Sequence, residues 1–244
     1  MTATRLDVLL TADVVVADRL RGTTALIVDV LRASTTVITA LGCGAIAIVP
    51  VRTPEEARAR AMVIGNALCA GERGGERIPC FDLGNSPVEA QSRPVGGRTI
   101  VLTTSNGTRA LLAARQASAI AMAGFVNLSA VVAWAEAERH DITVVCAGSM
   151  GAPSLEDQVC AGLLVDRLSA RVSAPVLTEI AAGSVDLARG YEKDIARLAV
   201  DSRWAQSLTR AGYAADVGMC LSLDTTTLVP LYLPGVDKVV PGPR

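Results

Sequence analysis

The sequence predicts an α/β protein of 244 residues, with a largely parallel or mixed sheet and flanking helices. Short apolar runs of strand length alternate with segments that carry helix-start signals. After residues 24–31, 99–103 and 142–146, an apolar run is followed by a polar loop and then by a helix. Because ligands bind beyond the carboxyl ends of the strands in such sheets, we expect these three loops to converge on one site.

The expected strands are short and mostly apolar. They cover residues 24–31, 45–51, 99–103, 119–123, 142–146 and 228–233. We expect the first of them to be a central strand that is buried on both faces, with Asp29 inside it. A carboxylate within an apolar strand is costly unless it is paired or bound to a metal, so Asp29 is a candidate functional residue.

The expected helices begin at hydroxyl or amide residues that suit the N-cap position. They run from residue 34 to about 41, 53 to about 67, 86 onward, 108 to about 116, 127 to 139 and 154 to about 170, and the pattern from residue 185 to 210 is helical. Thr53 and Ser86 are each followed by proline and, two residues later, by glutamate. This order is typical of a capped helix start.

Residues 71–89 (GERGGERIPCFDLGNSPVE) are rich in glycine, proline and charged side chains. Because the chain breakers are so frequent, this segment is not expected to form a core strand or an amphipathic helix. We expect a loop against a rigid scaffold, where binding and catalytic groups often collect. Asp82 and Asn85 would lie just before the partly positive N-terminus of the helix that Ser86 starts.

Composition argues against several classes of partner. The net charge is −1 and the pI about 5.9, so no nucleic-acid surface is expected. The apolar windows are too short to span a bilayer, and aspartates within the N-terminal apolar stretch argue against a signal peptide. We expect a cytoplasmic protein without membrane contact. The apolar content of 50% favours a homodimer.

A single domain is expected over residues 1–244. Two stretches of it are alike. Residues 34–41 followed by the tripeptide AIA at 45–47 resemble residues 105–111 followed by AIA at 119–121. An internal duplication of this kind would divide the domain into two similar subdomains near residues 90–100.

The polar loops carry groups that suit a small anion such as a phosphate ester. Helix N-termini present free N–H groups and a partial positive charge, and arginine adds bidentate contacts. Arg32 is the candidate catalytic cation. The candidate substrate-binding residues are Ser34, Thr35, Arg73, Asn85, Ser86, Ser105, Asn106, Gly107 and Thr108, and Arg77 and Arg109 are further cations.

Carboxylates near the same loops imply a cation, because they would otherwise repel an anionic ligand. Hard oxygen ligands in a chain with one histidine suggest magnesium. The candidate ligands are Asp29, Glu72, Asp82, Glu156 and Asp157, and Asp29 and Asp82 are also candidate catalytic residues. The sequence leaves Asp157 equally open to a purely structural role, since it lies three residues after Ser154 as in a capping box.

Several phosphate chemistries are excluded by their motifs. The chain has no GxxxxGK[ST] loop, and no arginine lies six residues after Cys146, as a cysteine-dependent phosphatase requires. The Asp29 motif lacks the second aspartate of haloacid-dehalogenase phosphatases. A single histidine, His140, excludes histidine phosphatases and histidine-rich dinuclear metallophosphatases.

The order and spacing of several motifs resemble the 2-phosphosulfolactate phosphatase family over roughly residues 25–165. These motifs are DVLRASTT (29–36), GERGG (71–75), IPC followed by FDLGNSP (78–87), TSNGT (104–108), CAG (146–148), SLED (154–157) and CAG (160–162). Together they are specific, whereas none of them is specific alone. One departure is Cys80, at which the family pattern has glycine.

The resemblance implies the compact α/β fold of that family and a magnesium-dependent phosphatase. The implied reaction converts 2-phospho-3-sulfolactate to 3-sulfolactate, a step toward coenzyme M. A substrate with phosphate, carboxylate and sulfonate groups needs several subsites rich in cations or N–H groups. Hydrolysis would proceed through a metal-bound water or through a phosphoaspartate, and the sequence does not separate these routes.

Two other functions stay open at this point. The first is a phosphatase on the same scaffold that acts on another small phospho-carboxylate. The second is a non-catalytic protein that binds a small anion. Magnesium-dependent phosphate release would separate an enzyme from a binding protein, and comparison of phosphorylated substrates would separate the two enzymes.

Overall fold

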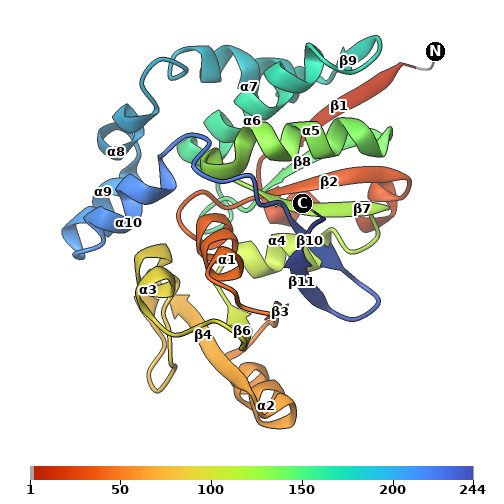
Figure 1. Cartoon of the computed structure of the whole chain (residues 1–244). Helices are drawn as coiled ribbons and strands as arrows, with labels where there is room; N and C mark the ends of the chain where they lie inside the picture. Colours follow the sequence, from red (N-terminus) through yellow and green to blue (C-terminus); the bar gives the residue numbers. More distant parts are fainter. Residues whose placement is uncertain (1–2, 244) are drawn as a thin grey trace.

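The computed structural model describes residues 3–243, and most of its strands join in one mixed sheet (Figure 1). The strands are β1 (Thr4–Leu9), β2 (Thr23–Val28), β3 (Ala47–Pro50), β4 (Ala67–Arg73), β5 (Glu76–Arg77), β6 (Thr99–Thr103), β7 (Ala119–Ala123), β8 (Asp141–Cys146), β9 (Pro175–Leu177), β10 (Pro230–Leu233) and β11 (Lys238–Pro241). Their order across the sheet is β5-β4-β6-β3-β11-β10-β7-β2-β8-β1-β9. The predicted α/β class is confirmed.

Two parallel groups of strands are joined by an antiparallel hairpin. The smaller group contains β4, β6 and β3, and the larger contains β7, β2, β8, β1 and β9. The hairpin of β10 and β11 pairs with β7 on one side and with β3 on the other. The chain places β1 and β2 in the larger group before it forms the smaller group, so the groups do not correspond to two consecutive halves of the sequence.

Helices cover both faces of the sheet (Figure 1). They are α1 (Ala33–Gly42), α2 (Pro54–Ile64), α3 (Pro87–Ser92), α4 (Gly107–Ala113), α5 (Leu128–Glu138), α6 (Leu155–Ser169), α7 (Glu179–Arg189), α8 (Leu198–Asp201), α9 (Arg203–Arg210) and α10 (Ala214–Cys220). Alternate side chains of β2 point to opposite faces. Leu26 packs in the core that includes α5, α6 and α7, and Ile27 packs in the core that includes α1 and α4.

The predicted capping motifs start helices as expected. The hydroxyls of Thr53, Ser86 and Ser154 accept hydrogen bonds from the backbone N–H groups three residues later and cap α2, α3 and α6. Asn127 precedes α5, but its side chain instead accepts from the N–H of Gly124 and donates to two backbone carbonyls. It therefore joins the end of β7 to the chain before β10.

The prediction for residues 71–89 is wrong at its start. Helix α2 ends at Ile64, and β4 begins at Ala67 and continues through Arg73, beside β6. Gly71 makes this approach feasible: its φ is +154°, and a Cβ there would lie 2.1 Å from the carbonyl oxygen of Thr103. The glycine that reads as a strand breaker in sequence is thus required for close pairing within the sheet.

Other boundaries also differ from the sequence predictions. Strand β2 ends at Val28, so Asp29 lies just beyond the strand rather than within it. The stretch 185–210 is not one helix, because α7 ends at Arg189 and two short helices follow. Strands β1, β9 and β11 were not predicted; β9 and β11 are short, and all three depend on their partners in the sheet. None of the helices described is both long and apolar enough to cross a lipid bilayer.

Candidate active site

Asp29 follows the carboxyl end of β2 and lies between the starts of two helices. Its Oδ1 accepts a hydrogen bond from the N–H of Ala33 at 3.2 Å, at the first residue of α1. On the other side stands Gly107, the first residue of α4, where a Cβ would lie 2.6 Å from Asp29 Oδ2. Glycine is required here because any side chain would displace the carboxylate or the helix.

Burial dominates the electrostatics of Asp29. The residue is 7% exposed, and loss of hydration raises the pKa of its carboxyl from 3.8 to about 7. The hydrogen bond from Ala33 lowers the pKa, whereas the charges of Glu72 and Glu156 raise it further. Several acidic groups therefore share this region, and their mutual repulsion would be relieved by a bound cation.

Glu72 is the second carboxylate of the site, and it joins the smaller group of strands to the start of α4. Its Oε1 accepts from the N–H of Ser105 at 2.6 Å, and its Oε2 accepts from the N–H of Gly75 at 2.8 Å. The side chain is buried, with 6% exposure. Glu72 thus fixes the loop after β6 and the turn after β4 in one arrangement.

A cavity of about 250 Å³ lies beside these two carboxylates. It is lined by Asp29, Leu31, Arg32, Glu72, Gly74, Gly75, Asn85, Ser105, Asn106, Ser149, Met150 and Trp204. The loops after β2, β6 and β8 each contribute to this lining, so their predicted convergence is confirmed. Trp204 of α9 closes part of the cavity and donates from Nε1 to the carbonyl of Leu31 at 3.0 Å.

Arg32 borders the cavity, but its charge is already paired. Its guanidinium donates to Asp216 Oδ2 at 2.7 Å and to the carbonyl of Gly75 at 2.5 Å, and it stacks 4.1 Å from the centre of the Tyr213 ring. Asp216 also accepts from the Ser86 hydroxyl at 2.7 Å. Sequence reasoning missed Asp216 because it lies in α10, 184 residues from Arg32, in no recognisable motif.

Asp157 lies behind the cavity and joins two of the converging loops. Its Oδ1 accepts from the N–H of Val30 at 2.8 Å, and its Oδ2 accepts from the N–H of Gly148 at 3.1 Å. Burial raises its pKa well above the ordinary value, and the charges of Asp29 and Glu156 raise it further. These contacts assign Asp157 a structural role, whereas its predicted part in metal binding stays a prediction.

Glu156 is buried beside Asp157 and has an Oε2 atom without a hydrogen-bond partner among the described residues. Burial raises the pKa of its carboxyl. It borders a neighbouring hollow of about 400 Å³ that shares Ser149 and Trp204 with the cavity lining. Glu156 therefore influences the site through its charge on Asp29 and does not line the cavity itself.

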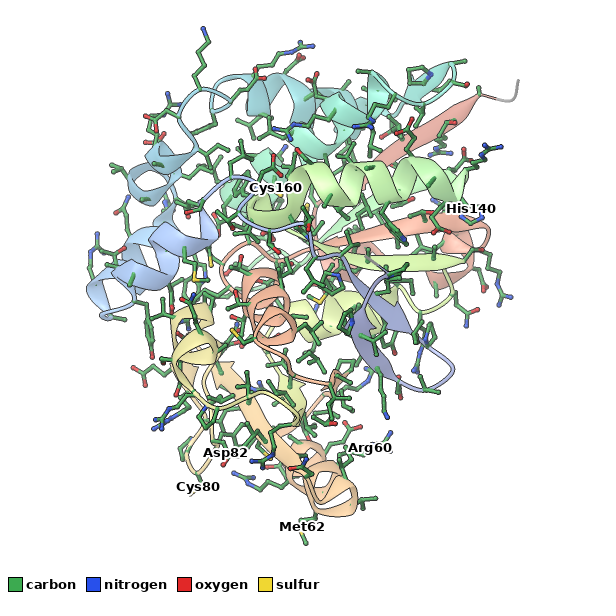
Figure 2. The ribbon with its side chains drawn as sticks, in the orientation of Figure 1. Arg60, Met62, Cys80, Asp82, His140 and Cys160 are labelled. Carbon is green, nitrogen blue, oxygen red and sulfur yellow. The ribbon has the colours of Figure 1, made fainter. Side chains whose placement is uncertain are left out.

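Three predicted residues lie away from the cavity. Asp82 is exposed, and its Oδ2 accepts from the N–H of Cys69 at 2.8 Å; Figure 2 places it at the outer end of the molecule near Cys80. Arg73 donates to Thr103 Oγ1 and to backbone carbonyls, and Arg109 pairs with Asp13. The structure does not bring Asp82, Arg73 or Arg109 to Asp29.

Most of the predicted hydroxyl groups support the loops instead of facing the cavity. Ser34 accepts from the N–H of Asp29 at 3.0 Å, and Thr108 accepts from the N–H of Thr104 at 3.1 Å. Ser86 caps α3, and Thr35 is fully buried. Ser105, Asn106 and Asn85 are the predicted binding residues that do line the cavity.

Cys80 has a conformation that explains the expected glycine. Its φ is 65°, in the left-handed region that glycine adopts without strain. The side chain is exposed, so the turn accommodates it without crowding a buried group. The cysteine that replaces the expected glycine therefore occupies an outer turn, and it does not line the cavity.

The oxygen donors at the cavity suit an open magnesium site, which needs only one or two carboxylates from the protein. Among residues 3–243, no three His, Cys, Asp or Glu side chains converge as a complete metal cage. Magnesium, however, is commonly held by one or two carboxylates, with water and substrate phosphate completing its octahedral shell. Asp29 and Glu72 border the same cavity, and the buried Oδ1 of Asn85 lacks a partner, so the side chains fit such an open site.

Comparison with known proteins places this arrangement in a family. Residues 9–234 match the family model described as 2-phosphosulpholactate phosphatase. The chain belongs to the 2-phosphosulpholactate phosphatase family. The match covers the cavity, the β10 strand and all ten helices described for residues 3–243. The predicted family is confirmed, and with it the prediction of a phosphoric monoester hydrolase at the level of the family.

Curated relatives extend over nearly the whole chain. A protein of Deinococcus radiodurans is 40% identical over 215 residues, which is 87% of this chain and 89% of the relative. A protein of Thermotoga petrophila is 39% identical over 213 residues, 87% of this chain and 90% of the relative. A protein of Clostridium acetobutylicum is 32% identical over 95% of this chain and 98% of its own length. Each is named "Probable 2-phosphosulfolactate phosphatase".

Proposed function

We propose that this protein hydrolyses 2-phospho-3-sulfolactate to 3-sulfolactate and phosphate in a magnesium-dependent reaction. The observation that carries the proposal is the cavity in which Asp29 and Glu72 lie beside the starts of α1 and α4, in a chain of this family. Two carboxylates next to positive helix termini can hold a cation and a phosphoryl group together. The proposed place of the reaction is the route to coenzyme M.

The chain would bind the phosphoryl group through the loop before α4. Ser105 and Asn106 border the cavity, and Glu72 holds the Ser105 backbone N–H in place. The partial positive charge at the start of α4 favours an anion there. Leu31 and Trp204 supply an apolar wall, which limits the access of water to the reacting phosphorus.

Asp29 and Glu72 would hold magnesium. When bound, the ion supplies positive charge to the phosphoryl oxygens, which offsets the negative charge of the transition state. Both carboxylates are held in place by backbone N–H groups, so the ligand atoms that they offer to the ion are fixed in position. The Asn85 amide oxygen can contribute a further neutral ligand or accept from bound water.

Two routes to the product are compatible with this geometry. In one, the Asp29 carboxylate attacks phosphorus, the bond from phosphorus to the 2-oxygen of sulfolactate breaks, and that oxygen takes a proton from water; a second water then cleaves the phosphoaspartate to Asp29 and phosphate. In the other, water attacks directly and its proton passes to a carboxylate of the site. Rapid acid quench during a single turnover with ³²P-labelled substrate separates them, because only the first route transfers label to the protein.

The experiment that tests the function is phosphate release from 2-phospho-3-sulfolactate by the purified protein, with magnesium and then with EDTA. We expect release that depends on magnesium and is restored when the metal is returned. Phosphoglycolate and 2-phospholactate serve as comparison substrates. Folded protein that releases phosphate from one of these but not from the sulfonate substrate would contradict the proposed substrate, and metal-independent release would contradict the role of magnesium.

A further inference from the structure

A second cavity adjoins the first. It has a volume of about 390 Å³, and three of its lining residues, Arg32, Gly75 and Asn85, also line the cavity at Asp29. The residues that line only the second cavity include Arg77, Ser86 and Tyr213. Because the two linings share three residues, the cavities are immediate neighbours, and Arg32, Gly75 and Asn85 stand between them.

Asn85 is an unusual residue for a structural position. It is 4% exposed, and its Oδ1 has no hydrogen-bond partner among the described residues. A buried amide oxygen without a partner costs free energy, about 1–3 kcal/mol for a typical polar group. Asn85 lines both cavities, and an anionic ligand that extends from one to the other can accept from its amide NH2 group, whereas Oδ1 needs a donor such as bound water.

Arg77 is the cation that the second cavity offers to a ligand. Within residues 3–243, its guanidinium has one polar side-chain partner, Glu89 Oε1 at 3.4 Å, and the side chain is 50% exposed. A guanidinium has five N–H donors, so most of them stay free for an anion. Arg32 also borders the cavity, but its charge is committed to Asp216.

The acidic groups around Arg77 hold it in position. Glu89 Oε2 accepts from the N–H of Gly84 at 2.7 Å, so the carboxylate that contacts Arg77 is anchored to the loop before α3. A Cβ at Gly84 would lie 3.4 Å from the Arg77 Cβ and 3.2 Å from Glu89 Oε2. Glu76 also lines the cavity but is exposed, where water and salt screen its charge.

The proposed substrate carries a phosphate, a carboxylate and a sulfonate on three carbon atoms. In the first cavity, Asp29 and Glu72 would repel a second anion that is not bound to the cation. We propose that the sulfonate lies in the second cavity, where Arg77 binds it and the Asn85 amide contacts the substrate at the junction. This assignment rests on the proposed function and makes Arg77 the residue that determines specificity for the sulfonate.

The test compares two substrates that differ at the sulfonate. 2-Phospholactate keeps the phosphate and carboxylate of 2-phospho-3-sulfolactate and has a methyl group in place of the sulfonate-bearing carbon. We expect Arg77→Ala to lower kcat/KM for the sulfonate substrate about 10- to 100-fold, as expected for the loss of a charge-assisted contact, mainly through KM. For 2-phospholactate the same change should alter kcat/KM by less than about twofold.

Arg93→Ala is the matched control. Arg93 is an exposed arginine at the end of α3 that lines neither cavity, so its removal changes the net charge equally. It should leave both substrates unaffected. Arg77→Lys, which keeps the charge but loses the forked donors, should recover part of the activity on the sulfonate substrate.

The outcomes separate the assignment from the proposed function. If the unsubstituted protein hydrolyses the sulfonate substrate but Arg77→Ala weakens both substrates equally, or weakens neither, the Arg77 assignment is wrong and the function stands. If the unsubstituted protein does not hydrolyse the sulfonate substrate, the proposed function is wrong and the assignment with it. A selective loss that Arg93→Ala does not reproduce supports both.

Discussion

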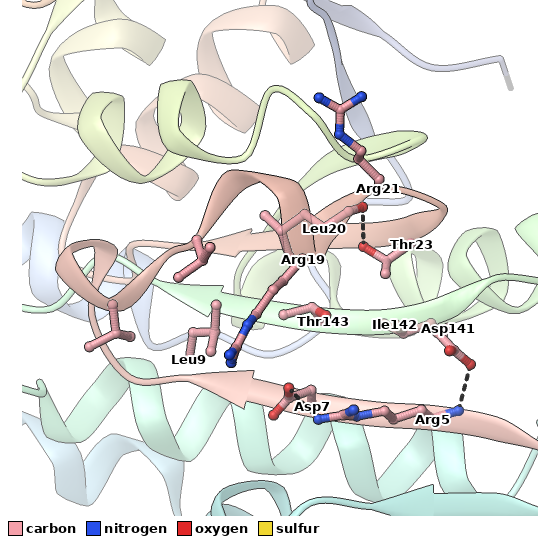
Figure 3. Close-up of a pocket in the computed structure, with 12 residues that line it drawn as sticks. Arg5, Asp7, Leu9, Arg19, Leu20, Arg21, Thr23, Asp141, Ile142 and Thr143 are labelled. Carbon is pink, nitrogen blue, oxygen red and sulfur yellow. Dashed lines mark hydrogen bonds and ion pairs between the residues drawn. The ribbon is translucent and has the colours of Figure 1, made fainter.

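Two hollows beside the same sheet differ in what surrounds them. The cavity at Asp29 follows the carboxyl ends of β2, β6 and β8, whereas a larger pocket of about 440 Å³ lies along β1 from Arg5 to Leu9 and against the first residues of β2 and β8. Figure 3 shows this pocket, with Arg5 and Asp7 of β1 and Arg19 of the turn before β2 among the side chains that line it.

In the larger pocket, charged side chains are paired with each other and exposed to solvent, as Arg5 and Asp7 illustrate. Arg5 lies 3.3 Å from Asp7, with the arginine side chain 61% exposed, and the Arg5 N–H donates to Asp141 at 2.7 Å. In the smaller cavity, Asp29 and Glu72 are more than nine-tenths buried. Burial removes the water that weakens electrostatic interactions, so a charge in the smaller cavity interacts more strongly with a bound ligand than a charge in the larger pocket does. Volume alone would favour the larger pocket, whereas the buried carboxylates favour the smaller cavity.

The sharpest test of this comparison replaces a buried aspartate and, in a separate variant, an exposed aspartate by asparagine. We expect Asp29→Asn to lower kcat at least about 1,000-fold, because it removes a carboxylate from the reacting centre. The asparagine can still accept from the Ala33 N–H, so the fold should persist. Asp82→Asn should retain at least about half of the activity, since Asp82 is exposed and contacts only a backbone N–H of β4.

Phosphate release and thermal unfolding together check this prediction. Circular dichroism of both variants verifies that they are folded. A strong loss with Asp82→Asn would restore Asp82 as a candidate catalytic group and would place the reacting centre elsewhere.

A smaller but substantial effect is expected at the contact between Asp29 and α4. Gly107→Ala would place a Cβ 2.6 Å from both Asp29 Oδ2 and the Ala33 Cβ, so the carboxylate or the helix must move. We expect kcat/KM to fall about 10- to 100-fold, as displacements of about 1 Å commonly cause. Gly183→Ala in α7 is the control: its Cβ meets no atom within 4 Å, and it should leave activity unchanged while stabilising the helix slightly.

The buried carboxyl of Asp29 also predicts a dependence of stability on pH. In the folded protein its pKa is about 7, against 3.8 for an ordinary aspartate. Between these values the folded state binds more protons than the unfolded state, so this group makes stability fall as the pH rises, and the loss is complete above the folded pKa.

Thermal unfolding in EDTA at about pH 5 and pH 8 measures this contribution. The melting temperature of the unsubstituted protein should fall by more than that of Asp29→Asn across the interval, because only the former must ionise this carboxyl. Glu156 and Asp157, whose pKa values burial also raises, give both proteins a remaining slope of the same sign. Equal slopes for the two proteins would show that Asp29 is not the titrating group.

The smallest effect is expected in the larger pocket along β1. Arg19→Ala removes an exposed cation that lies along that pocket. Surface changes of this kind usually alter stability by less than about 0.5 kcal/mol. We expect unchanged kcat and KM for phosphate release, and a change of more than about threefold would show that this pocket takes part in the reaction.

Some of the predicted site residues come together in one cavity because loops after parallel strands meet at one edge of the sheet. Asp29, Glu72, Asn85, Ser105 and Asn106 share a cavity as this rule implies. Asp82 belongs to the same segment as Asn85 but does not reach the cavity, since its carboxylate is engaged by the Cys69 N–H. The sequence does not indicate which of Asp82 and Asn85 faces the cavity, because the direction of a loop side chain depends on what the loop packs against.

Local patterns in the sequence are sufficient to predict the class of the fold, most of the strands in the interior of the sheet, and the capped helix starts at Thr53, Ser86 and Ser154. These features depend on local periodicity and on hydrogen bonds between residues a few positions apart. The tertiary structure alone decided that the β10–β11 hairpin joins the two parallel groups and that Asp216 pairs with Arg32. Such contacts join distant segments of the chain, and only packing against a common core brings those segments together.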